Sequence, residues 1–223
     1  MTKKFYAVLL IVLLTPSYVQ AQFSFGGRMG YNLTKFSEKD KYQPHDFNKF
    51  LEGFQIGVVG EYAVSDAFAI QPVILLTTQR GQYKHSNTYR TLTKINYLQI
   101  PINALYKLNL GDTKLLLQAG AYFGYALSGK RECVGEHNFH GFLMSHHECE
   151  QKIKFGKQHM MKPFDFGLGL GAGLQLGNVQ AGVGYNIGLA NLSTYHKDWN
   201  HSLKNRGWAI TLTHFFGKNY HEE

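Results

Sequence analysis

Apolar and polar residues alternate with a period of two over eight stretches of this chain, and such alternation predicts β-strands. In one of these stretches, Phe54, Ile56 and Val58 share one parity while Gln55 and Gly57 take the other. Each stretch is long enough to cross a bilayer when tilted, which takes about 9–11 residues. The predicted strands cover 23–34, 54–64, 68–80, 95–109, 114–127, 164–177, 179–191 and 206–216.

The connections between these stretches alternate between short and long. Tight turns are expected at 65–67, 111–113 and 177–178, where turn-forming residues gather. The remaining connections are long and polar, at 35–52, 81–94, 128–163 and 192–204. An even strand number with alternating short turns and long loops is typical of outer-membrane barrels. We therefore predict an all-β fold, an eight-stranded antiparallel transmembrane β-barrel in a Gram-negative outer membrane, with both termini in the periplasm.

The parity also predicts which face of each strand meets lipid. One parity carries Leu, Ile, Val and Phe, whereas the other carries mainly Gly, Gln, Asn, Ser and Thr. The second set suits the lumen of a narrow barrel, so the first should face lipid. A soluble lipocalin-like carrier, with its apolar face inside, is the alternative fold. Aromatic residues near both strand ends predict two interfacial girdles: Phe23, Phe25, Tyr62, Phe68, Tyr106 and Phe216 at the short-turn end, and Phe54, Tyr125, Phe164, Phe166 and Trp208 at the long-loop end.

The first residues differ in composition from the rest of the chain. Lys3 and Lys4 precede the apolar run FYAVLLIVLL, and a small-residue site ends at Ala21, which predicts a secretory signal peptide over 1–21. Residues 22–223 would then form one barrel domain. Removing the two lysines lowers the formal net charge from +8 to +6 (8 − 2). A secreted basic chain is expected to meet outer-membrane lipid and lipopolysaccharide phosphates rather than nucleic acid.

Three stretches resemble the PorT-like outer-membrane β-barrel family of Bacteroidota. They are INYLQIPINALYKL (95–108), FDFGLGLGAGLQLGNVQAGVGYNIGLANLS (164–193) and NRGWAITLTHFF (205–216), with YLQIP and FDFG as the most specific pieces. The resemblance implies a small eight-stranded barrel that the barrel-assembly machinery inserts. Some members serve protein secretion and gliding, so envelope or secretion proteins are expected partners. One fold hosts many functions, so the resemblance bears mainly on fold and location.

Charged residues on the lumen-facing parity form the first candidate site. Arg28 and Glu61 are expected near the short-turn end, across from one another on adjacent strands. Together with Gln71, Lys107 and Gln118 they would plug a narrow lumen. The alternative is a gated channel for small solutes with the Arg28–Glu61 pair as its latch.

The connection 128–163 holds the two cysteines of the chain, Cys133 and Cys149. An even cysteine count in an oxidising compartment favours a disulfide. A zinc or copper site is the alternative, although the spacings match no recognised metal motif. Its ligands would come from the histidines between the cysteines, His137, His140, His146 and His147. The favoured interpretation requires no metal and no cofactor.

The last long connection raises the question of an enzyme, because His196, Asp198 and His201 lie close together in STYHKDWNHS. An Asp–His pair can act as a general base, but the chain has no G-x-S-x-G nucleophile elbow. We therefore expect a non-enzymatic scaffold whose loops serve adhesion, envelope or secretion-related interactions, with a rim-located enzyme as the alternative.

Glycine recurs at alternate positions of 164–193. Gly167, Gly169, Gly171 and Gly173 share one parity, and a second glycine row follows the turn at 177–178. Since both rows take the lumen-facing parity, we expect them to leave room for bulky side chains from the opposite wall and to allow tight curvature. The expected bulky side chains are those of Arg28, Tyr97 and Tyr122.

Overall fold

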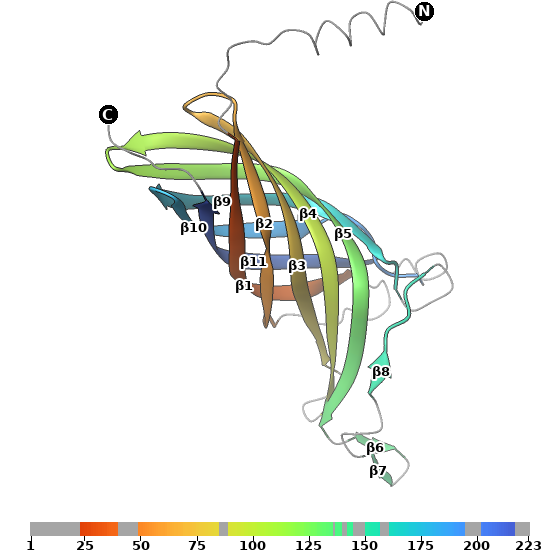
Figure 1. The fold of residues 1–223 in the computed structure, drawn as a ribbon. Helices are drawn as coiled ribbons and strands as arrows, with labels where there is room; N and C mark the ends of the chain where they lie inside the picture. The colour runs from red at the N-terminus through yellow and green to blue at the C-terminus, as the bar shows by residue number, and fades with distance from the viewer. Residues whose placement is uncertain are drawn as a thin grey trace, which may run out of the picture.

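Eight long antiparallel strands form a closed ring (Figure 1). The computed structural model describes residues 23–39, 49–84, 89–135, 137–139, 142–144, 150–156, 161–194 and 202–216. The ring strands are β1 (Phe23–Lys39), β2 (Leu51–Ala63), β3 (Phe68–Lys84), β4 (Tyr89–Leu110), β5 (Thr113–Gly135), β9 (Phe164–Leu176), β10 (Val179–Gly188) and β11 (Ser202–Phe216). Three short strands complete the set: β6 (His137–Phe139), β7 (Phe142–Met144) and β8 (Gln151–Lys152).

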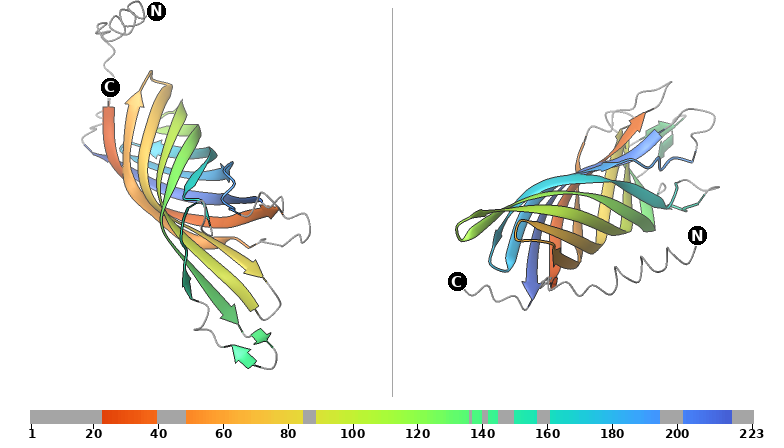
Figure 2. Two further views of the ribbon diagram at one scale, coloured as in Figure 1. Left: turned by 90° about the vertical axis from the view of Figure 1, so that its right-hand side faces the viewer. Right: turned by 90° about the horizontal axis from the view of Figure 1, so that it is seen from above.

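Each ring strand pairs with its neighbours in sequence order, and the first strand pairs with the last. The order is β4-β3-β2-β1-β11-β10-β9-β5, and the β4–β5 pairing closes the ring. The short β8 continues the sheet beyond β5, while β6 and β7 form a separate hairpin (Figure 2). The prediction of an eight-stranded antiparallel barrel is therefore confirmed. Among the described residues, no helix is long and apolar enough to cross a membrane.

The strands of the β3–β4–β5 region are longer than the alternation predicts. The loop expected at 81–94 is wrong, because β3 continues to Lys84 and β4 begins at Tyr89. Likewise β5 continues to Gly135, well into the loop expected at 128–163. These additions are polar on both faces, so they lack the apolar alternation of a strand that faces lipid. Cross-strand pairing maintains them instead, with Leu92 paired to both Gln82 and Glu132.

Two of the three tight turns depend on glycine. Gly111 has a φ of 75° in the β4–β5 turn, and Gly177 has a φ of 52° in the β9–β10 turn. Both lie in the left-handed region, which glycine enters without the steric cost that a side chain adds. The β2–β3 turn instead uses a side chain, because the Phe68 amide donates to the Ser65 hydroxyl at 3.1 Å. We call this end of the barrel the short-turn end and the other the long-loop end.

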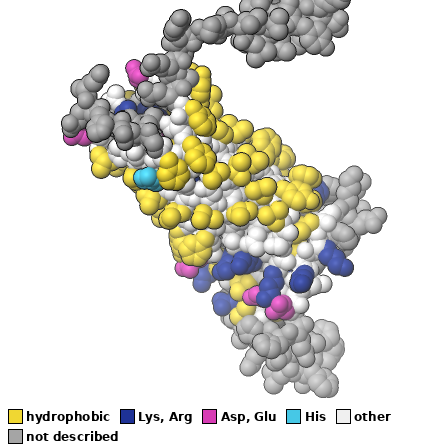
Figure 3. Space-filling model, in the orientation of Figure 1, with side chains coloured by type: hydrophobic (Ala, Val, Ile, Leu, Met, Phe, Trp, Pro, Cys, Tyr) yellow, Lys and Arg dark blue, Asp and Glu magenta, His cyan; other side chains and the backbone are white. Residues whose placement is uncertain are grey.

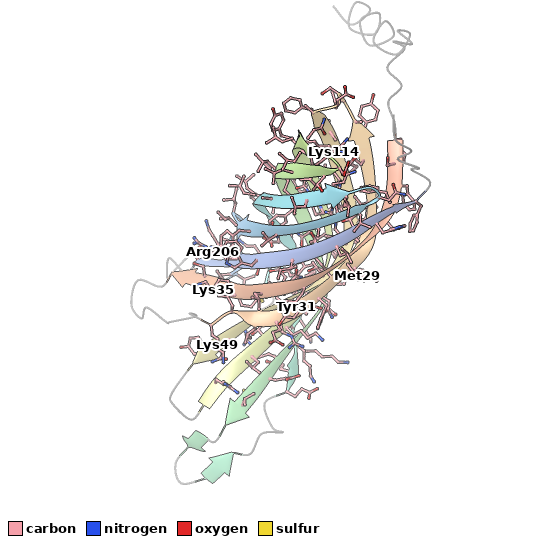
Figure 4. All side chains as sticks on the ribbon, turned by 90° about the vertical axis from the view of Figure 1, so that its left-hand side faces the viewer. Met29, Tyr31, Lys35, Lys49, Lys114 and Arg206 are labelled. Carbon is pink, nitrogen blue, oxygen red and sulfur yellow. The ribbon has the colours of Figure 1, made fainter. Side chains whose placement is uncertain are left out.

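The distribution of side chains is the inverse of that in a water-soluble protein. On β2 the apolar Phe54 and Ile56 are 69% and 62% exposed, whereas Glu61 is 1% exposed. Exposed apolar side chains lie on the outer face of all eight ring strands, and Figure 3 shows those on one side of the barrel. On β1, Met29 and Tyr31 belong to this outer face, and Lys35 lies nearer the long-loop end (Figure 4). The predicted parity of lipid-facing and lumen-facing positions thus agrees with the structure.

The lumen is less polar than the sequence indicated. Val59, Val73, Leu75 and Phe215 form a buried apolar cluster inside it, although they occupy the lumen-facing parity. A second small cluster of Ala69, Leu105 and Leu116 lies in β3, β4 and β5. The lumen is narrow enough for apolar side chains to meet one another, which removes their surface from water.

The glycine rows make room for neighbours rather than for the opposite wall. A Cβ added at Gly167 would meet the Tyr122 ring at 2.6 Å, and Tyr122 is the direct cross-strand partner of Gly167. At Gly171 the added Cβ would meet the Gln118 amide nitrogen at 2.6 Å, again from β5. Of the three bulky side chains expected there, Tyr122 takes up this space and also reaches Gly188 of β10, with its hydroxyl 3.2 Å from an added Cβ. Arg28 and Tyr97 are not among the nearest neighbours of these glycines, so that part of the expectation is wrong.

Candidate functional site

A buried polar cluster crosses the lumen and joins strands from both sides of the barrel. The ammonium of Lys107 on β4 donates to a carboxylate oxygen of Glu61 on β2 at 2.5 Å. Glu61 also accepts at 3.1 Å from Gln71 of β3 and at 3.0 Å from Gln180 of β10. The carboxylate therefore accepts hydrogen bonds from three donors, and these offset the free-energy cost of burying its charge.

The Gln71 side chain links this carboxylate to the cation of β1. Its amide oxygen accepts from the Arg28 guanidinium at 2.5 Å, while its amide nitrogen donates to Glu61 and to Gln180. Arg28 also donates to the Thr213 hydroxyl of β11 at 2.7 Å. Two cations, one carboxylate and their polar partners thus form one connected hydrogen-bond network.

The structure places Arg28 and Glu61 in this cluster, but not in the register that the sequence suggested. Arg28 pairs with Gly57, and Glu61 pairs with Ser24, so the two charges lie four positions apart along the β1–β2 ladder. The expectation that they stand across from one another is wrong. The stagger between tilted barrel strands is set by ring closure, which strand lengths read from the sequence do not reveal.

Four of the five residues expected to plug the lumen join this cluster, and the fifth lies elsewhere. Gln118 is only partly buried, beside Gly171 and Gly184, and no described hydrogen bond joins it to the cluster. Gln175, Gln180 and Thr213 take part although the sequence did not single them out. They share the lumen-facing parity with many other polar residues, so parity alone could not select them.

A second buried group lies nearer the long-loop end. Asp165 of β9 accepts from the Asn205 amide at 2.7 Å and from the Tyr122 hydroxyl at 3.3 Å. Beside it, an apolar cluster lies across this end of the lumen and includes residues from the segments between the strands. Its buried members are Phe36, Ile95, Tyr97, Ala126, Ile153, Met161, Ala190 and Leu192.

Backbone hydrogen bonds fix the connecting segments against the barrel at this end. The Ile153 amide donates to the Gly129 carbonyl at 2.9 Å, and the Leu192 amide donates to the Leu203 carbonyl at 2.8 Å. Ile153 and Leu192 are therefore buried in the apolar cluster at this end of the lumen. Between the two buried groups a polar cavity of about 10 Å³ is left. That is about the room of one water molecule.

The eleven aromatic residues of the expected girdles all lie on the outer face, each at least 38% exposed. Several stack on a cross-strand neighbour: the ring centroids of Phe68 and Tyr106 are 4.9 Å apart, and those of Tyr125 and Phe164 are 5.1 Å apart. The first pair lies at the short-turn end and the second near the long-loop end. Aromatic residues therefore stand at both edges of the apolar surface.

The candidate residues of the long connections fall mostly outside the described residues. Cys133 is in a disulfide, and Cys149, the other cysteine of the chain, is not described. Of the four histidines between them, His137 lies in β6 but its side chain is not described, and His140, His146 and His147 lie outside the described residues, as do His196, Asp198 and His201. Within the described part of the chain, no group of histidine, cysteine and carboxylate side chains could hold a metal ion.

Comparison with known proteins identifies the class of barrel. The family model described as "Outer membrane protein beta-barrel domain" matches residues 19–194. The comparison with curated proteins gave no match.

Solved structures of small outer-membrane proteins resemble the fold. OprG from Pseudomonas aeruginosa is 10% identical, with 89% of this chain and 98% of that chain covered and a TM-score of 0.43. The attachment invasion locus protein Ail of Yersinia pestis is 15% identical, with coverage of 86% and 98% and a TM-score of 0.42. Neisserial surface protein A is 12% identical, with coverage of 86% and 96% and a TM-score of 0.39.

Proposed function

Since this chain belongs to the outer membrane protein β-barrel domain family, we propose that it acts as a membrane-embedded scaffold with a closed lumen. The scaffold holds its long-loop end at the cell exterior, where it makes adhesion, envelope or secretion-related contacts. In this proposal the protein is not an enzyme and needs no cofactor. The barrel-assembly machinery inserts it, with both termini in the periplasm.

The filled lumen is the observation that carries this proposal. Lys107, Glu61, Gln71 and Arg28 bridge the barrel through buried hydrogen bonds. Apolar side chains occupy much of the remaining space, and the polar cavity is too small for a solute. A conducting state would have to separate a buried charge pair, which costs several kcal/mol. A scaffold therefore fits this lumen better than a gated channel.

The extended end of the barrel supports a role in contacts with other molecules. β4 and β5 continue past the apolar surface, and β8 adds a further strand to β5 there (Figure 2). An ordered sheet beyond the membrane offers a rigid platform on which loops can be positioned. The motifs YLQIP and FDFG support a narrower assignment to PorT-like barrels with a role in secretion. The disulfide of Cys133, paired with Cys149, would stabilise this platform in an oxidising compartment.

An epitope tag is expected to show that the long-loop end faces the cell exterior. A tag inserted within 85–88 should bind antibody on intact cells. A tag inserted after Asp112, in the β4–β5 turn, should bind antibody only after the outer membrane is permeabilised. Heat-modifiable gel mobility verifies that both tagged proteins fold. Antibody binding to the Asp112 tag on intact cells would contradict the proposed orientation.

A further inference from the structure

Four basic residues from four strands stand side by side at the long-loop end. Arg80 pairs with Lys94, Lys94 pairs with Lys130, and Lys130 pairs with Lys152. Directly paired residues of antiparallel strands point to the same face of the sheet, so the four side chains form one row across β3, β4, β5 and β8. We call this the basic row. Like charges directly opposite one another destabilise a sheet, so an anion that binds to the row would relieve repulsion within it.

The basic row borders the apolar outer surface of the barrel. On β4, Asn96 separates Lys94 from Leu98, which belongs to the apolar face. On β5, the exposed Leu127 lies three positions from Lys130, next to a bulge in the β4–β5 ladder. Figure 3 shows Lys and Arg side chains gathered directly beyond the apolar surface. In a bilayer, lipid headgroups occupy this height, just outside the hydrocarbon region.

A cavity of about 420 Å³ opens along the basic row. Three cations (Lys94, Lys130 and Lys152) and one carboxylate (Glu150) line it together with the apolar side chains of Leu127 and Phe155. Its size is in the range of sites that bind small molecules, about 300–1,000 Å³. The lining therefore combines an excess of cations with apolar surface, which complements an anionic lipid headgroup joined to acyl chains.

Two glutamates balance part of the positive charge, and both contact the same lysine. The Lys130 ammonium lies 2.9 Å from a carboxylate oxygen of Glu132 and 3.0 Å from one of Glu150. The hydrogen bond from Lys130, helped by attraction from Lys130, Arg80 and Lys94, keeps the pKa of Glu132 below its ordinary value. Within the described residues, Arg80, Lys94 and Lys152 form no salt bridge. The group of four cations and two carboxylates has a formal charge of +2 (4 − 2).

We propose that the basic row binds the phosphate of a phosphorylated glycolipid of the outer leaflet, of the lipid A type. A phosphate supplies negative charge and several acceptor oxygens, which pair with Lys94, Lys152 and Arg80. The acyl chains lie against Leu127 and the apolar surface below it. This inference rests on the proposed outward orientation of the long-loop end, but it is independent of whether the lumen is closed.

The test is a binding titration of the full-length refolded protein in phosphatidylcholine nanodiscs with diphosphoryl lipid A. The double variant Lys94→Gln, Lys152→Gln should bind lipid A about 25-fold more weakly than the wild type. Each cation removed near the membrane surface is expected to lower the affinity about fivefold, and two are removed. The control variant Lys49→Gln with Lys204→Gln removes the same charge from residues outside the row and should bind like the wild type. The variant Lys94→Arg with Lys152→Arg keeps the charge and should retain binding.

A second measurement separates a binding defect from a folding defect. In nanodiscs of phosphatidylcholine alone, the Lys94→Gln, Lys152→Gln variant should unfold at the same temperature as the wild type or at a higher one, because the repulsion within the row is relieved. Only the wild type and the arginine variant should gain stability when lipid A is added.

Three results would overturn the inference. Equal binding of fully dephosphorylated lipid A would exclude phosphate recognition, and equal weakening in the control variant would indicate diffuse attraction to a charged rim. Competition by inorganic phosphate at the affinity of lipid A would identify a free-phosphate site instead. If the tag experiment placed the long-loop end in the periplasm, the proposed orientation would be wrong, but the titrations would still report lipid A binding. A failure of the proposed orientation and a failure of this inference are therefore distinguishable.

Discussion

Replacing Glu61 with alanine is expected to lower the free energy of unfolding by about 3–5 kcal/mol, the range for removing one partner of a buried ion pair. Glu61 is 1% exposed, and its carboxylate accepts from Lys107 at 2.5 Å. Without it, the Lys107 ammonium stays buried with no counter-charge, and Gln71 and Gln180 each lose an acceptor. Urea titration in lipid vesicles, read by heat-modifiable gel mobility, measures the change.

Glu52 on the same strand provides the matched control, because its side chain is exposed. Glu52→Ala should change the free energy of unfolding by less than about 1 kcal/mol, as is usual for surface charges. The double variant Glu61→Leu with Lys107→Met should recover much of the lost stability, because replacing both ions removes the uncompensated charge. Equal stability of Glu61→Ala and Glu52→Ala would contradict the role assigned to the buried cluster.

The second large effect is expected at Gly57, a lumen-facing glycine of β2. A Cβ at this position would overlap the carbonyl oxygen of Ile74 on β3, which is backbone and cannot rotate away. The β2–β3 pair must therefore shift to accept alanine, and such overpacking costs about 1–3 kcal/mol. The same urea titration applied to Gly57→Ala measures this cost.

Gly27 on β1 is the natural comparison for Gly57. It takes the lipid-facing parity, and an added Cβ would meet only the Phe216 ring, at 3.8 Å. Gly27→Ala should therefore unfold within about 0.5 kcal/mol of the wild type, as surface substitutions usually do. If Gly57→Ala proved as stable as Gly27→Ala, the close approach of β2 and β3 at this glycine would be wrong.

The alternation of side chains was sufficient to predict the ring of strands and the face that each residue takes. Phe54 and Gln55 illustrate why: in a barrel one face meets lipid and the other meets the lumen, so every position has a strong preference. The extensions of β3, β4 and β5 escaped prediction because polar residues occupy both of their faces. A position there has no such preference, and the sequence shows no period of two.

The sequence was sufficient to predict which residues face the lumen, but not which of them contact one another. Arg28, Glu61 and Lys107 stood out as charges on a polar parity, and the structure brings them into one cluster. Their actual neighbours, including Gln180 and Thr213, depend on how far the strands are staggered around the ring. The basic row was likewise hidden, because its members are separated in sequence and only the registers of three strand pairs bring them together.

Planar-bilayer recording of the purified, refolded protein tests the closed lumen most directly. The buried network around Glu61 and the apolar cluster at the long-loop end leave a cavity with room for about one water molecule. The wild type should therefore insert without producing stable open channels. Stable open channels of large conductance from the wild type would contradict the closed lumen.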